Sequence, residues 1–122
     1  MKAVLIISHG SHSRKTKQEV KKLTQILKSG TQIKIFKYAI LEIEQPDILA
    51  GIDRCIKQRA TEIIILLNFL NSGRHVDIDI PCIVNQAKRK YPKIAFFISK
   101  PVGQHPRIRE LFIDMINEAV RG

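Results

Sequence analysis

Two histidines follow buried-strand patterns at equivalent places in this sequence. Residues 1–7 form an apolar run that leads into His9, and residues 63–67 form a second apolar run, after which a polar segment reaches His75. In open α/β sheets, ligands bind at the carboxyl ends of the strands, so a histidine just beyond a buried strand is a candidate binding or catalytic group. A single histidine of this kind is more often part of a helix-entry turn, but two in matching positions favour a shared site.

The chain alternates between strand and helix patterns, with no linker or repeat. Strands are predicted at residues 1–7, 31–39, 63–67 and 93–99. Helices are predicted at residues 13–29, from Pro46 to about residue 59, at about residues 80–90, and from Pro106 onward. The last helix has the cleanest apolar stripe, which consists of Ile108, Leu111, Phe112, Met115, Ile116 and Ala119.

This alternation predicts a single α/β domain over residues 1–122, in which a four-stranded parallel sheet is flanked by helices on both faces. Right-handed crossovers place the four strand-to-helix loops on one edge of such a sheet. The polar residues expected at that edge are Ser8, His9, Gly10 and Ser11 from the first loop, Glu42 and Glu44 from the loop at residues 41–45, Asn71, Arg74 and His75 from the third, and Gly103, Gln104 and His105 from the fourth. We therefore expect His9 and His75 to face one another.

Imidazole and carboxylate groups at one edge could serve a metal ion or a proton transfer. Imidazole nitrogens bind Co, Ni, Fe, Cu and Zn, and two histidines with one glutamate would form an open site that can exchange its metal. The same side chains could also accept protons from an acidic ligand. The residues alone leave both uses open.

Composition narrows the class of partner without choosing one. The chain has 21 Lys and Arg against 11 Asp and Glu, a formal net charge of +10, which attracts nucleic acid or a small polyanionic ligand. No apolar run approaches the ~20 residues of a membrane span. Cys55 and Cys82 are too few and too far apart for a disulfide framework, so both are expected in or near the core of a cytoplasmic protein.

Several common active-site patterns are absent from the sequence. Ser8 precedes His9, where histidine phosphatases carry arginine, and neither a G-x-x-x-x-G-K-[ST] loop nor G-x-G-x-x-G occurs. Ser11 lacks the G-x-S-x-G setting of a hydrolase nucleophile. Nucleic-acid-binding motifs are also absent, which argues against the nucleic-acid interpretation of the net charge.

Four segments, in order along the chain, resemble the small CbiX-type sirohydrochlorin chelatases. They are SHGS at residues 8–11, ILE at residues 40–42 with Pro46 after it, FL-x-x-G-x-H-x-x-x-DIP at residues 69–81, and PVGQHP at residues 101–106. The pattern at 69–81 is the specific part. Ser8 stands where the family usually has glycine.

The resemblance implies insertion of a divalent metal (cobalt, nickel or iron) into sirohydrochlorin, a tetrapyrrole with eight carboxylate arms. It implies that His9 and His75 handle the metal and accept protons, with Glu42 as a further candidate. The residues expected to bind the substrate are Ser11, Glu42, Asn71, Ser72, Gly73 and Arg74. The metal is a substrate in this scheme, so no permanently bound cofactor is expected.

The resemblance also implies a homodimer. Some members of the family are about twice this length and enclose a cleft between two such domains, so a single domain would form half of the enclosure. A second copy related by a two-fold axis could form the other half.

Two other classes of function stay open at this stage. A metal- or tetrapyrrole-binding carrier would keep the same site without turnover. A basic nucleic-acid-binding α/β module would account for the net charge but not for the loop histidines.

Overall fold

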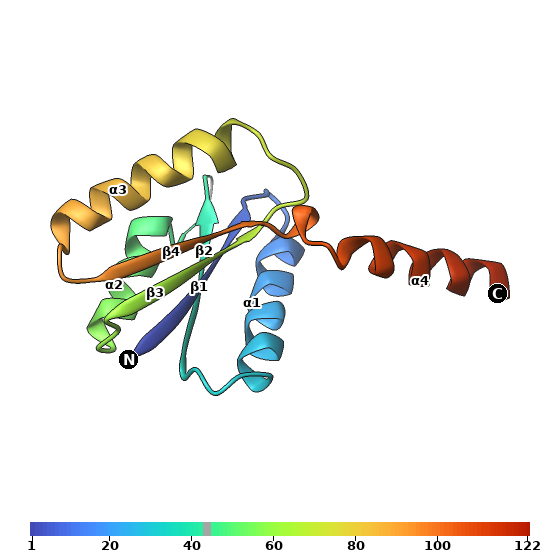
Figure 1. The fold of residues 1–122 in the computed structure, drawn as a ribbon, viewed down its shortest axis with the longest axis horizontal. Helices are drawn as coiled ribbons and strands as arrows, with labels where there is room; N and C mark the ends of the chain where they lie inside the picture. Colours follow the sequence, from blue (N-terminus) through green and yellow to red (C-terminus); the bar gives the residue numbers. More distant parts are fainter. Residues whose placement is uncertain (43–44) are drawn as a thin grey trace.

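The computed structural model describes residues 1–42 and 45–122, and four parallel strands form its centre (Figure 1). The strands are β1 (Lys2–His9), β2 (Ile35–Leu41), β3 (Glu62–Asn68) and β4 (Ala95–Pro101). Their spatial order is β2-β1-β3-β4, and each pair of neighbours is parallel. The predicted four-stranded parallel sheet is therefore confirmed, and the two strands that precede the histidines, β1 and β3, lie side by side.

Helices and short helical turns connect the strands. They are α1 (Arg14–Ser29), α2 (Ile48–Lys57), the π-helical turn η1 (His75–Asp79), α3 (Ile80–Lys90), the 3-10 turn η2 (Val102–Gln104) and α4 (Ile108–Arg121). The Ser13 hydroxyl accepts a hydrogen bond from the amide of Lys15, and the Asp47 carboxylate accepts one from the amide of Ala50. These caps satisfy amides that have no partner inside the helix, which explains where α1 and α2 begin.

The sheet has a thick apolar layer on one face and a thin one on the other. α2 and α3 cover the first face, where the larger core includes Ile52 and Ile80 together with side chains from every strand. α1 covers part of the second face, where the smaller core is centred on Val4, Ile6 and Phe36. β1 lies between the two layers, and its apolar run is continuous because both of its faces are buried.

Strands extend further toward the binding edge than predicted, because neighbouring backbones continue to pair. β1 ends at His9 rather than at residue 7, since His9 still pairs with Leu41 of β2. β2 begins at residue 35 rather than 31 and includes Leu41, which was predicted to lie in the following loop. β4 is displaced by two residues from the predicted range, because it pairs with β3 up to Pro101.

The segment after β2 differs from the prediction at its proline. Pro46 precedes the Asp47 cap instead of opening α2, and its carbonyl oxygen accepts a hydrogen bond from the amide of Ile40 at 2.8 Å. This bond ties the proline to the end of β2 rather than to the helix. Glu44, which was predicted at the binding edge, lies outside the described residues.

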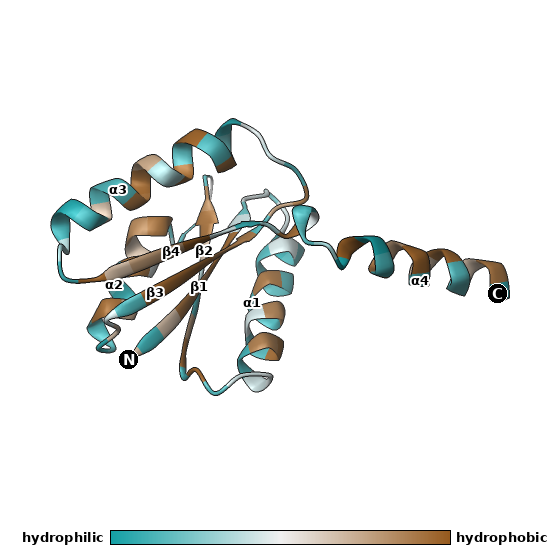
Figure 2. Ribbon diagram, in the orientation of Figure 1, coloured by the Kyte–Doolittle hydropathy of each residue, from teal (hydrophilic) through white to brown (hydrophobic). Residues whose placement is uncertain are grey.

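α4 departs most from the predicted arrangement. Helices flank both faces of the sheet as expected, but α4 is not one of them: it extends away from the sheet (Figure 1), and none of its side chains is buried. Figure 2 shows its apolar side standing free along much of its length. Beside α1, the sheet is correspondingly open at β4, where Phe97 is 58% exposed.

Over residues 1–42 and 45–122, no helix combines the length and apolar composition that crossing a bilayer requires.

The two cysteines lie in different environments. Cys55 is fully buried in the larger core, and this burial raises the pKa of its thiol to about 11. Cys82 is exposed, so the prediction of a position in or near the core is wrong for this residue. It lies two positions after Ile80 on α3, and two positions along an α-helix point to the opposite side from the one that meets the core.

We expect one thiol per chain to react quickly with a thiol-specific reagent in mildly alkaline buffer, and two after unfolding in denaturant. The reason is that accessibility and thiolate fraction control the rate, and Cys55 lacks both. The measurement is the number of thiols modified over time. A Cys82→Ser variant should lose the fast phase, and a fast phase that survives in it would show that Cys55 is accessible in the folded chain.

Candidate metal centre at the carboxyl edge of the sheet

The loop after β1 lies against the end of β2 because residue 10 is glycine. The amide of Gly10 donates a hydrogen bond to the carbonyl oxygen of Leu41 at 3.0 Å. A Cβ atom at position 10 would overlap the carbonyl oxygen of Glu42 and lie 3.0 Å from that of Leu41. Only a residue without a side chain permits this approach, which brings His9 and Glu42 to the same place.

Glu42 has a backbone conformation that most residues avoid. It immediately follows β2, and its φ of 63° lies in the left-handed region, which costs a residue with a Cβ atom roughly 1–2 kcal/mol. Local strain of this kind concentrates at functional sites. Here it accompanies a carboxylate whose Oε1 atom lies 3.6 Å from Nε2 of His75.

His75 lies on a helical turn rather than in the loop predicted for it. The amide of Asp77 donates to the carbonyl oxygen of Gly73 at 2.8 Å, and the amide of Ile80 donates to that of His75. The resulting turn, η1, runs directly into α3. Because residues four apart lie on the same side of a helix, Asp79 is placed beside His75.

His9, Glu42 and His75 form one cluster. One potential ligand atom from each side chain lies within 4.8 Å of the other two. The two imidazole rings meet edge to face, with centroids 5.3 Å apart and an interplanar angle of 79°. The prediction that the two histidines face one another across this edge of the sheet is therefore confirmed.

Hydrogen bonds set the tautomers of both rings. Nδ1 of His75 lies 2.8 Å from the Asp79 carboxylate, which can only accept, so Nδ1 carries the proton and Nε2 keeps its lone pair. Nδ1 of His9 lies 3.3 Å from the carbonyl oxygen of Gly10, which favours the same tautomer. Carboxylate–histidine pairs commonly orient the metal-binding histidines of proteins in this way.

Two imidazole nitrogens and one carboxylate oxygen are a donor set for divalent transition metals. The side chains of His75 and Glu42 are 37% and 52% exposed, so a metal held by the cluster would keep coordination positions open toward solvent. An open centre of this kind suits a metal that must be taken up and passed on.

The other predicted site residues are close in sequence to His9 and His75 and have contacts of their own. The Ser11 hydroxyl accepts a hydrogen bond from the amide of Ser13 at 3.1 Å, within the turn before α1. Residues 71–73 form an exposed segment between β3 and η1, and the Ser72 hydroxyl accepts a hydrogen bond from the side chain of Gln104. This bond joins the third and fourth loops of the binding edge.

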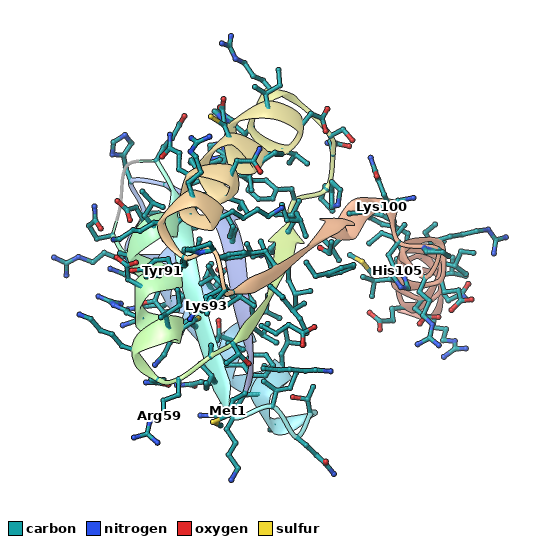
Figure 3. All side chains as sticks on the ribbon, turned by 60° about the vertical axis from the view of Figure 1, so that its left-hand side comes forward. Met1, Arg59, Tyr91, Lys93, Lys100 and His105 are labelled. Atoms are coloured by element: carbon teal, nitrogen blue, oxygen red, sulfur yellow. The ribbon has the colours of Figure 1, made fainter. Side chains whose placement is uncertain are left out.

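Among residues 1–42 and 45–122, Arg74 is exposed and has no ion-pair partner, so its charge is available to an anion. His105, expected on the same edge, is not part of the cluster: its Nδ1 atom accepts a hydrogen bond from the amide of Arg107, and it lies at the base of α4 (Figure 3). His12 is exposed in the turn before α1 and is also outside the cluster.

Three residues near the cluster were not among the site residues predicted from the sequence. Asp79 orients His75, Phe69 packs edge to face with His9 at a centroid distance of 6.2 Å, and the Asn68 amide donates to the Ser8 hydroxyl at 2.9 Å. Ser8, Asn68 and His9 border a cavity of about 430 Å³ beside α1. The spacing of four between His75 and Asp79 could have revealed Asp79, but only if the segment had been interpreted as helical.

The CbiX family model matches residues 3–119, which include all three members of the cluster. The chain belongs to the CbiX family. This agrees with the resemblance noted at the four sequence segments, three of which each contribute one residue to the cluster.

Proteins of known activity lie among its relatives. The chain is 27% identical over 118 residues to the chloroplastic sirohydrochlorin ferrochelatase of Arabidopsis thaliana, a match that covers 97% of this chain and 51% of that protein. It is 23% identical to the sirohydrochlorin cobaltochelatase of Methanopyrus kandleri, with 98% of both proteins covered. The crystal structure of the sirohydrochlorin chelatase SirB from Bacillus subtilis subspecies spizizenii in complex with cobalt matches 96% of this chain and 50% of its own, with a TM-score of 0.85 and 27% identity. The chain thus spans about half, or less, of the first curated relatives that it matches.

Replacing Glu42 with glycine and with alanine separates backbone strain from metal binding. Both changes remove the carboxylate, but only alanine keeps a Cβ atom in the left-handed conformation. We expect Glu42→Gly to be more stable than Glu42→Ala by about 1 kcal/mol in urea unfolding. Both variants should bind Co²⁺ at least about tenfold more weakly in calorimetry. Equal stabilities would contradict the strained conformation, and unchanged Co²⁺ affinity would remove Glu42 from the centre.

Proposed function

We propose that this chain is a sirohydrochlorin metallochelatase, which inserts a divalent metal ion into the macrocycle. Co²⁺ is the first candidate, and Ni²⁺ and Fe²⁺ are the alternatives. The observation that carries the proposal is the cluster of His9, Glu42 and His75 at the carboxyl edge of a CbiX-family fold. The substrate and the type of reaction are supported by the names of the relatives, among them the Methanopyrus kandleri protein, which is matched over 98% of its length.

The cluster supplies the two things that metal insertion requires. When M²⁺ enters a tetrapyrrole, two pyrrole protons leave, so metal ligands and proton acceptors are needed in one place. Asp79 orients the ring of His75 through Nδ1. In the neutral ring, Nε2 then has a lone pair that can bind the metal or take up a proton. His9 and Glu42 lie within reach of the same point and can serve as the second ligand or base.

The charge of the chain suits a substrate with many carboxylates. The formal net charge is +10, and Arg74 lies next to His75 at the start of η1 with its guanidinium exposed. A positive surface raises the local concentration of a small polyanion and its rate of association. We also propose that the substrate contacts residues 71–74, which directly precede His75 in the chain, and Ser11, which lies two residues after His9.

A homodimer is part of the proposal. The cluster is open to solvent on one side, since His9 and Glu42 are exposed. A second copy related by a two-fold axis would provide the opposite wall for the macrocycle.

The direct experiment is an absorbance assay that follows sirohydrochlorin with Co²⁺, Ni²⁺ and Fe²⁺ in turn. Spectral change faster than the reaction without protein is expected for at least one metal, and the order of rates identifies the preferred one. A spectral change that stops once about one sirohydrochlorin per protein chain has reacted would indicate a carrier. No spectral change with any of the three metals would overturn the proposed activity.

His75→Ala should reduce turnover by about two orders of magnitude or more, because alanine supplies neither a metal ligand nor a base. The melting temperature should change by no more than about 4 °C, since the His75 ring is partly exposed and the neighbouring Val76 makes the core contact. His12→Ala is the matched control, because it removes an exposed histidine from the same edge but outside the cluster. Normal turnover in His75→Ala, or equal losses in the two variants, would contradict the assigned role.

If the positive surface attracts the substrate, the rate at which sirohydrochlorin associates with the protein should fall as the salt concentration is raised. The reason is that the Debye length shrinks from ~10 Å at 0.1 M to ~3 Å at 1 M. Arg74→Ala should weaken sirohydrochlorin binding, measured by fluorescence quenching, more than it weakens Co²⁺ binding. Arg89→Ala removes the same charge at the far end of α3 and should have little effect. Salt-independent association would leave Arg74 without this function.

A further inference from the structure

A separate hollow lies where β2 forms one edge of the sheet. Its volume is about 380 Å³, which is in the range of small-molecule pockets, and it shares no lining residue with the cavity beside His9. Lys37, in its wall, is four residues before the end of β2, which puts it about 13 Å from that end along the strand. We call this hollow the β2-edge pocket. Its lining includes Lys21 and Thr24 from α1, Phe36, Lys37 and Tyr38 from β2, and Arg54 from α2.

The alternation of side chains along β2 explains why the pocket has walls from both helices. Ile35 and Ala39 belong to the larger core on the α2 side, whereas Phe36 belongs to the smaller core on the α1 side. Because side chains alternate in a strand, Lys37 lies on the α2 side and Tyr38 on the α1 side. The pocket therefore passes around the edge of the sheet, from α1 to α2.

Three cations border the pocket, and no acidic residue does within the part of the chain that the structure describes. Lys21, Lys37 and Arg54 come from three different elements, and none of them takes part in an ion pair between described residues. Positions three and four residues away along a helix, where an acidic partner would lie, also hold no acid. They are Lys17, Gln18, Thr24 and Gln25 around Lys21, and Ala50, Gly51, Lys57 and Gln58 around Arg54. The three positive charges are therefore left to an anion that enters the pocket.

Backbone amides at the free edge of β2 add neutral donors to this positive wall. The amide of Ile40 donates to the carbonyl oxygen of Pro46, which is not part of the neighbouring strand β1. Backbone groups two residues apart in a strand point to the same side, so the amides of Phe36 and Tyr38 also point to the free edge. Backbone N–H groups form short, strong hydrogen bonds with anionic oxygens.

The combination suits a phosphate group on a small organic molecule. A phosphate monoester carries a charge of about −1.5 to −2 at pH 7 and has three acceptor oxygens, so it can engage several cations at once. The planar guanidinium of Arg54 can bind two of these oxygens together. Phe36 is buried and Tyr38 is half-buried, so their rings form an apolar wall for the organic part. A hollow of this size holds a small molecule rather than a long polyanion.

We propose that the β2-edge pocket binds a small molecule that carries a phosphate group. Lys21, Lys37 and Arg54 bind the phosphate oxygens, and the ring of Tyr38 contacts the organic part of the molecule. The pocket contains none of the three residues of the metal centre, so its ligand binds without sirohydrochlorin and without a metal ion.

Calorimetric titration with inorganic diphosphate, in the absence of metal and sirohydrochlorin, tests the pocket independently of the proposed chelatase activity. Arg54→Gln should weaken diphosphate binding at least about tenfold, because it removes hydrogen bonds between charged groups. Lys57→Gln is the matched control, since both residues are basic and lie in the last turn of α2, but only Arg54 lines the pocket. The control should change the affinity by less than about twofold, because an exposed charge that makes no contact is screened. No binding to the wild-type protein, or equal losses in the two variants, would overturn the proposal.

A second pair of variants keeps the test informative if Arg54→Gln fails to fold. Lys21 and Lys22 are adjacent, exposed residues of α1, and only Lys21 lines the pocket. Lys21→Gln should therefore weaken diphosphate binding more than Lys22→Gln does, and the reverse order would contradict the site.

Titration with succinate at the same ionic strength distinguishes a phosphate from a carboxylate ligand. Succinate should bind at least about tenfold more weakly than diphosphate, because each carboxylate has a single charge and two oxygens. If succinate binds as tightly as diphosphate and loses the same affinity in Arg54→Gln, the pocket takes carboxylates and the phosphate assignment is wrong.

Discussion

The candidate metal centre depends on the close approach of two backbone segments, the turn at Gly10 and the end of β2 at Leu41 and Glu42. A parallel sheet brings the ends of neighbouring strands to about 5 Å from one another but does not place their side chains at ligand distance. The absent side chain at position 10 allows the turn after His9 to reach the carbonyl oxygens of Leu41 and Glu42. The strained φ of Glu42 belongs to the same contact, because the carbonyl oxygen of Glu42 is one of the two that approach position 10.

The third member of the cluster is held by a different means. His75 lies at the first position of a π-helical turn, so its ring is oriented by a helix and by Asp79 rather than by a flexible loop. The pair Asp79–His75 determines which ring nitrogen faces Glu42 and His9, and this choice decides whether the ring can bind a metal. The hydrogen bond to Asp79 orients His75 toward the strained Glu42, and both side chains belong to the candidate metal centre.

The two faces of the sheet differ in how many apolar side chains are buried against them. The layer under α2 and α3 contains most of the buried side chains, including residues of β1, β2 and β3. The layer under α1 is thin, and Phe97 of β4 on the same face is 58% exposed.

The sequence alone determined the number of strands, their parallel pairing, and the edge at which His9 and His75 meet. Burial of apolar runs and the handedness of crossovers leave few topologies for an alternating chain of this length. The pattern at residues 69–81 also pointed to the CbiX family before any geometry was known.

Three features were decided only by the tertiary structure, and each has a physical reason. The turn at residues 75–79 depends on hydrogen bonds whose partners are not evident from residue types, and so does the role of Asp79. The exposure of Cys82 depends on which side of α3 meets the sheet. The position of α4 cannot be derived from its apolar stripe, since such a stripe indicates that a helix needs an apolar partner without indicating which surface provides it.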